Sequence, residues 1–171
     1  MSLGQQNIAV LAQARDLLAQ LDPAHLEPSG STSGVGAHLR HCFDAYRCFL
    51  RGLDADGLID YDARERDVEV ERDPNIALAR VDELVCALDA LSVDAANQPV
   101  RVRHDAAAWE HADPWSQSTV ARELQFLLSH TIHHYALIAH LLAVRGVEVD
   151  ATFGVAPSTL EYRSAVATCA Q

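Results

Sequence analysis

The stretch VARELQFLLSHTIHHYALIAHLLAVRG, residues 120–146, decides the fold class of this chain. Apolar residues recur in it every three or four positions, which is the period of an amphipathic α-helix. Gly146 supplies a glycine stop at its end. We therefore expect this segment to be the longest helix of the protein, with an apolar stripe that other helices must cover.

Three further segments carry the same helical period and supply those partners: residues 5–21, 34–53 and 74–91. Asp22-Pro23 is predicted to stop the first, hydroxyl side chains in EPSGSTSG (27–34) to cap the second, and Asp73-Pro74 to open the third. A long charged crossover, residues 54–74, joins the second helix to the third. Four helices of this length favour an all-α four-helix bundle, in one domain over residues 1–171.

The remaining segments are short. QPVRVRH (98–104) alternates apolar and basic residues, which predicts a short extended piece. WEHADPWSQST (109–119) is predicted to be a loop, and the tail after residue 146 to contain turns and a short helix as a C-terminal extension.

The charge balance narrows the classes of partner. The chain carries 13 basic and 24 acidic side chains, a formal net charge of −11. This charge argues against nucleic-acid binding and against anionic membrane surfaces, since both need clustered basic residues. Four cysteines without a CxxC pair predict free thiols, and we find neither a signal peptide nor an uncharged membrane span. We therefore expect a cytoplasmic protein.

Histidines interrupt the apolar pattern of the longest helix. His130 and His134 lie four residues apart, so they share one face with the apolar residues Phe126 and Leu127, while His133 lies to the side. Two neutral imidazoles at this spacing form half of a first-row metal site. The alternative is a pair of core histidines, each hydrogen-bonded to a polar partner of its own.

The helix over residues 34–53 offers a third imidazole in the string AHLRHCFDAY (37–46). His41 shares its face with the small residues Ala37 and Ala45, which leave room for an ion, and His38 is the alternative. Ligands from facing helices converge in the core of a bundle. One histidine from this helix and two from the longest helix would make a three-imidazole site with open positions, as catalytic metals have.

Other polar residues are candidates to surround such a site. Asp44 and Glu123 are candidates to accept the second N–H of metal-bound imidazoles. Tyr135 is a candidate hydrogen-bond donor to a reactant. In the charged crossover, Arg64 or Arg66 would clamp an anionic substrate through its planar fork, and Arg66 is the preferred candidate.

Four strings together resemble the DinB-like (DinB/YfiT) superfamily: GVGAHLRHCFDAY (34–46), DYDARERD (60–67), RELQFLLSHTIHHYALI (122–138) and FGVAPSTLEY (153–162). The resemblance spans residues 31–162. It implies an up-down-down-up four-helix bundle and a divalent metal held by His41, His130 and His134. His133 matches a common family position that does not bind the metal.

The resemblance also implies a homodimer, and some relatives are transferases or isomerases that depend on low-molecular-weight thiols. Our first hypothesis is therefore a metal-dependent enzyme that activates a water or a thiol, for hydrolysis of a small molecule or for thiol transfer. Three imidazoles suit zinc, nickel, iron or copper alike, and zinc or nickel is the ion we expect. The second hypothesis is a non-catalytic metal-binding or stress-related binding protein, and the third is a metal-free helical interaction module.

Overall fold

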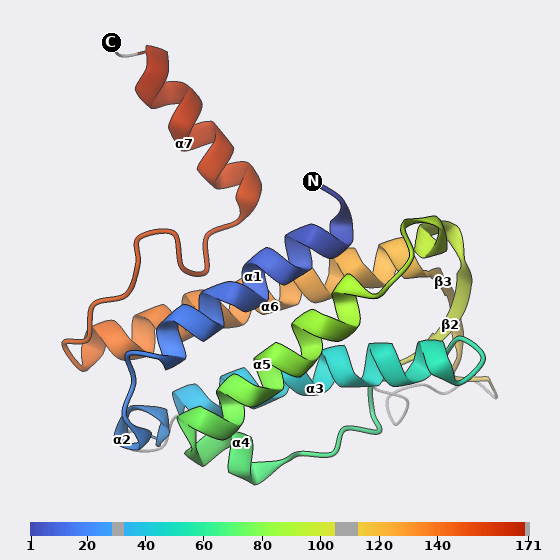
Figure 1. Ribbon diagram of the computed structural model, residues 1–171, viewed down its shortest axis with the longest axis horizontal. Helices are drawn as coiled ribbons and strands as arrows, with labels where there is room; N and C mark the ends of the chain where they lie inside the picture. The colour runs from blue at the N-terminus through green and yellow to red at the C-terminus, as the bar shows by residue number, and fades with distance from the viewer. Residues whose placement is uncertain (29–32, 105–112, 170–171) are drawn as a thin grey trace.

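The structure, a computed structural model, describes residues 1–28, 33–104 and 113–169. Four long helices form its body: α1 (Leu3–Leu18), α3 (Val35–Asp54), α5 (Pro74–Asp89) and α6 (Val120–Val144) (Figure 1). Helix α1 packs against α5 and α6, and α3 packs against the same two helices from the other side. The predicted all-α four-helix bundle is confirmed.

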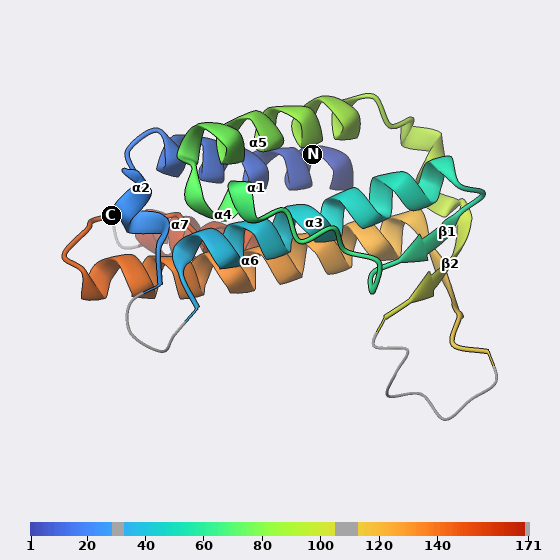
Figure 2. The ribbon, with the colours of Figure 1, turned by 90° about the horizontal axis from the view of Figure 1, so that it is seen from below.

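The helices run up-down-down-up, as the resemblance implied. Figure 2 shows α3 and α5 running in one direction and α1 and α6 in the other. The charged crossover makes this possible because it returns the chain along the bundle between α3 and α5. It contains a short strand, β1 (Leu58–Asp60), and a one-turn helix, α4 (Val68–Arg72), which packs against α3 and α5.

A three-stranded sheet lies at the end of the bundle where α3 ends and α6 begins (Figure 2). Strand β1 pairs in parallel with β2 (Pro99–Arg103), which pairs antiparallel with β3 (Ser116–Thr119). The extended piece is thus confirmed. The loop prediction is wrong for residues 116–119, because this polar segment gains its strand from the backbone of β2 and not from an apolar pattern; residues 109–112 lie outside the described part of the chain.

The helix boundaries differ from the sequence expectation at two places. Helix α1 ends at Leu18, and Asp22-Pro23 opens a separate short helix, α2 (Pro23–Leu26), because proline is well tolerated in a first turn. The residue before α3 is Gly34, which has no side-chain cap, so the predicted hydroxyl cap is wrong; residues 29–32 lie outside the description. At α5, by contrast, Asp73 caps the helix through the Asn75 backbone N–H, as expected.

Helix α6 occupies the core side of the bundle against α1 and α3, and its residues Leu127, Ile138 and Leu142 are fully buried. Among the described helices, α6 is the one whose length and composition alone would suffice to cross a membrane. Its packing against α1 and α3 covers part of its apolar surface, while Leu137 and Val144 are exposed.

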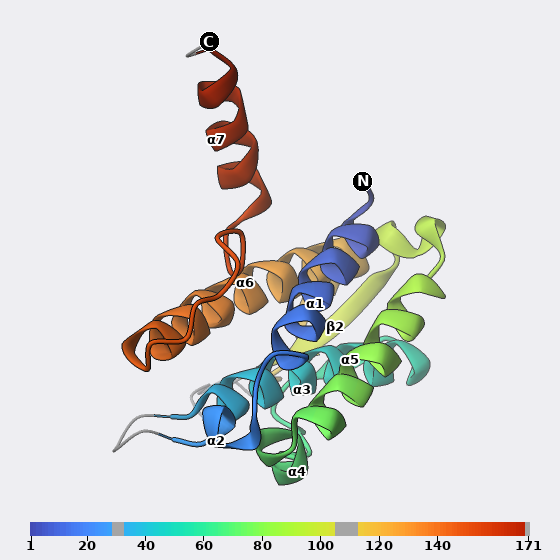
Figure 3. The same ribbon diagram turned by 60° about the vertical axis from the view of Figure 1, so that its left-hand side comes forward.

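After α6 the chain folds back onto the bundle and then leaves it. Phe153 is buried and stacks on Tyr135 with ring centroids 4.8 Å apart. The last helix, α7 (Pro157–Cys169), extends away from the four long helices (Figure 3). The remaining element, a short 3-10 helix η1 (Val93–Asn97), joins α5 to β2.

Candidate metal centre

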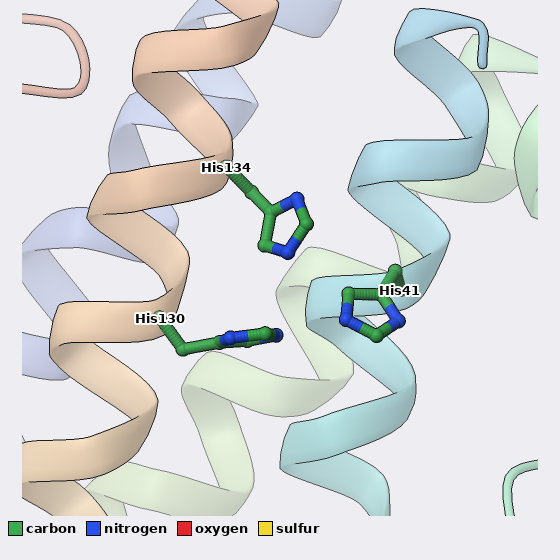
Figure 4. Close-up of side chains that lie close together, drawn as sticks. All are labelled: His41, His130 and His134. Atoms are coloured by element: carbon green, nitrogen blue, oxygen red, sulfur yellow. The ribbon is translucent and has the colours of Figure 1, made fainter.

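Three imidazoles from two adjacent helices converge on one point. Figure 4 shows His41 on α3 facing His130 and His134, which lie one turn apart on α6. The ring centroids are 4.8 Å apart for His41 and His130, 4.7 Å for His41 and His134, and 4.6 Å for His130 and His134. One ring nitrogen of each lies within 4.8 Å of the others. The structure therefore brings together the three histidines that the resemblance named.

The second ring nitrogen of two of these histidines has a partner outside the cluster. Nδ1 of His134 lies 2.9 Å from Nδ1 of His38, and Nδ1 of His41 lies 2.8 Å from Nη1 of Arg64. In both rings this leaves Nε2 for a shared ligand. His38, the alternative ligand in the sequence, thus lies behind His134 as its hydrogen-bond partner.

Burial and nearby side chains keep the three imidazole rings neutral at neutral pH. Burial, followed by nearby imidazoles and, at His41 and His130, nearby arginines, lowers the pKa of His41, His130 and His134 to about 4 in each case. Phe126 stacks on His130 with centroids 5.4 Å apart and covers one side of the cluster. Neutral imidazoles with free lone pairs are the form in which histidine binds metals.

The donor set fits a divalent transition metal. Three neutral nitrogens held by two rigid helices, all half-buried, correspond to the protein share of a catalytic zinc site, in which further positions stay open to a reactant. Nickel, copper and ferrous iron accept the same ligands. Hard oxygen-seeking ions such as Mg²⁺ and Ca²⁺ do not fit three imidazoles.

Asp44 is buried close to the site but is already paired. Its carboxylate accepts from Nη1 of Arg40 at 3.1 Å. Burial raises the pKa of Asp44, although Arg40 opposes the shift. In the described part of the chain its hydrogen bond goes to Arg40 and not to an imidazole.

Glu123 is fully buried and its carboxylate is shared by three donors: the Tyr61 hydroxyl at 2.8 Å, the Ser118 hydroxyl, and Nη1 of Arg122 at 3.0 Å. These contacts join the start of α6 to β3 and to Tyr61, the residue that follows β1. The sequence placed Glu123 two turns before His130, but its described partners make it a structural link between α6 and the sheet.

Glu123→Gln is therefore expected to destabilise the fold while leaving the metal site intact. The amide retains one acceptor oxygen where the carboxylate offers two, so one buried donor is left unsatisfied at a cost of about 1–3 kcal/mol. Chemical denaturation would measure this loss, and a zinc competition titration should give an affinity within about threefold of the unsubstituted protein. Gln125→Ala, at an exposed position of the same helix, is the control. A tenfold loss of zinc affinity in Glu123→Gln would contradict this assignment.

Tyr135 lies in the core of the bundle. It is fully buried, its ring stacks on Phe153, and its hydroxyl has no hydrogen-bond partner among the described residues. Burial raises the pKa of Tyr135, and the neighbouring Cys42 and Tyr46 add to the shift. A donor role toward a reactant finds no support in this placement.

Arg64 and Arg66, the two candidate arginines of the crossover, have different positions. Arg66 is exposed and has a positive φ of 54°, whereas Arg64 is partly buried and reaches His41. The side chain of the sequence candidate Arg66 is therefore exposed, and Arg64 is the guanidinium at the site. Sequence reasoning named both residues, but the path of the crossover decides between them.

Comparison with known proteins identifies a matching family and a curated relative. The family model described as "DinB family" matches residues 3–162. A curated protein named FK506-binding protein 5, from Rhizopus delemar, is 30% identical over 105 residues, which are 61% of this chain and 27% of that protein. The chain thus spans about a quarter of the length of this relative. No solved structure matches the chain significantly.

Proposed function

The chain belongs to the DinB family, and from this membership and its convergent imidazoles we propose that it is a metal-dependent enzyme acting on a small molecule. The ligands in this proposal are His41, His130 and His134, and the ion is zinc or nickel. The observation that carries it is the approach of three ring nitrogens, from α3 and α6, to within 4.8 Å of one another.

The chemistry of such an ion defines the reaction class. A divalent ion bound there would supply Lewis acidity, which lowers the pKa of a water or a thiol and makes it nucleophilic at neutral pH. Hydrolysis and thiol transfer both use this chemistry, with a low-molecular-weight thiol as the proposed co-substrate for the second.

Residues around the three histidines orient the imidazole rings and line a cavity for the substrate. His38 holds the ring of His134 through the contact between their Nδ1 atoms, and Phe126 fixes His130 by stacking. On the side of Phe126, a cavity of about 240 Å³ is lined by Tyr61, His104, Ser118, Arg122 and other residues of the sheet end. We propose that part of the substrate enters this cavity.

The experiment tests metal binding and catalytic turnover separately. The protein is stripped with a chelator, reloaded with zinc or nickel, and assayed for conjugation of low-molecular-weight thiols and for ester and amide hydrolysis. Turnover that appears with metal and disappears in His130→Ala supports the enzyme. Metal binding that raises the melting temperature without turnover in either assay would favour the non-catalytic metal-binding protein.

The lowered histidine pKa values predict a flat pH dependence of metal affinity. With a pKa of about 4, each imidazole stays neutral at pH 6, so zinc affinity should change less than about twofold between pH 7.5 and 6.0. Three imidazoles at the ordinary pKa of 6.5 would instead lose roughly 50-fold over that interval, because each would gain a proton. Competition titrations at the two pH values measure this. A loss near the second figure would show that the rings titrate normally.

Homodimer formation, the absence of nucleic-acid and membrane partners, and a cytoplasmic location stay predictions of the sequence. Gel filtration with light scattering tests the first of these directly.

A further inference from the structure

We propose that Arg64 binds a carboxylate group of the substrate beside His41, an inference that rests on the proposed metal site. The argument begins with the contact between Nη1 of Arg64 and Nδ1 of His41, which are 2.8 Å apart. A guanidinium has five N–H donors and no acceptor. In this contact Nδ1 of His41 must therefore accept, and the proton of the neutral ring sits on Nε2.

Metal binding reverses this arrangement. Figure 4 shows the His41 ring facing His130 and His134, and Nδ1 is the nitrogen engaged by Arg64, so Nε2 is the atom available to a shared ion. When Nε2 gives its lone pair to an ion, the ring proton moves to Nδ1. Two donors then face each other at hydrogen-bond distance, and a guanidinium lies close to a divalent cation. Both effects favour opening of this contact, or insertion of an acceptor between the two groups.

The nearby buried carboxylates of the chain are already engaged and do not supply an acceptor between Arg64 and His41. Metal-bound imidazoles normally donate their second N–H to a carboxylate or another acceptor. The two nearby buried carboxylates, those of Asp44 and Glu123, are held by Arg40 and by Tyr61, Ser118 and Arg122. In the described part of the chain, no carboxylate lies within ion-pair distance of Arg64.

The neighbouring arginines differ from Arg64 in having carboxylate partners. Arg40 pairs with Asp44 and Glu71, while Arg47 and Arg51 both pair with Glu65. Arg64 instead has a ring nitrogen as its partner, and its Nε is buried without any hydrogen-bond partner among the described residues. Its donors are thus incompletely used at the edge of the site.

A carboxylate matches these donors. Its two oxygens accept from the parallel N–H groups of a guanidinium, and one of them can also accept from Nδ1–H of His41. A carboxylate also neutralises the guanidinium next to the ion. It suits the site better than a phosphate dianion, because a single carboxylate balances the charge of the Arg64 guanidinium and the chain carries a net charge of −11. The substrate class is therefore a small molecule with a carboxylate.

The experiment measures zinc affinity by chelator competition, in acetate and in chloride at equal ionic strength, for the full chain and for Arg64→Gln. In chloride, Arg64→Gln should bind zinc about tenfold more tightly, because the opposing guanidinium is gone. In acetate, the unsubstituted protein should gain about tenfold and Arg64→Gln less than about twofold. Acetate that coordinates the ion directly affects both proteins, so it cancels when the two gains are compared.

Arg66→Gln is the matched control, since it removes an exposed guanidinium two residues away and should behave like the unsubstituted protein in both media. An equal acetate gain in Arg64→Gln and the unsubstituted protein overturns the role of Arg64 and leaves the metal site standing. A protein that binds no zinc in either medium overturns the proposed function, and with it this inference.

Discussion

His41→Ala, His130→Ala and His134→Ala are each expected to weaken zinc binding by about 100-fold or more. Each substitution removes one of three nitrogens that approach within 4.8 Å of one another, and two imidazoles leave an ion held mainly by water. Elemental analysis of the purified variants and competition titrations with zinc measure the effect.

Two other histidines provide comparisons for this prediction, one with no expected loss of zinc affinity and one with a smaller loss. His140→Ala, at an exposed position of α6, should retain full zinc affinity. His38→Ala should lose about tenfold, because its ring orients His134 without lying in the cluster. Full metal content in a variant of His41, His130 or His134 would remove that residue from the ligand set.

Gly36→Ala is expected to lower the free energy of unfolding by about 3 kcal/mol. A β-carbon at this buried position of α3 would lie 1.9 Å from the backbone oxygen of Glu71, so α4 would have to move away from α3. That movement would also disturb the ion pair between Arg40 and Glu71, which joins the two helices. Urea or guanidinium denaturation measures the loss.

Gly4→Ala is the matched control. In α1 the added β-carbon would meet only the Ser2 hydroxyl oxygen, 3.9 Å away, and alanine is the better helix former by about 1 kcal/mol. We expect this variant to be as stable as the original protein or slightly more so. A Gly36→Ala variant that loses less than about 1 kcal/mol would show that α4 moves without cost and that its packing on α3 is loose.

The site was predictable where it depends on spacing within one helix. His130 and His134 share a face because they lie four residues apart, and that relation needs no knowledge of the rest of the fold. The choice of His41 over His38 was harder, because two residues three apart on α3 lie on adjoining faces. It depended on the resemblance and on the small residues beside His41, and the structure places His41 in the cluster and His38 behind His134.

The surroundings of the site were not predictable in the same way. Asp44 and Glu123 were selected for their positions along α3 and α6, but their partners come from distant parts of the chain or from unforeseen neighbours. Tyr61 lies 62 residues from Glu123 in sequence, and only the path of the crossover brings the two side chains together. Arg64 and Arg66 are equivalent in the sequence pattern, and the positive φ of Arg66 is part of what separates them.

The sequence by itself determined the four helices, their apolar faces and the pair of imidazoles on α6, since these follow from a local period of 3.6 residues. The tertiary structure decided which polar group meets which: the third imidazole, the arginine behind it, the carboxylates that are already paired, and the strand formed by residues 116–119. The physical reason is that a hydrogen bond or a shared ligand depends on atoms within a few ångströms of each other, and the packing of segments far apart in the chain sets those distances.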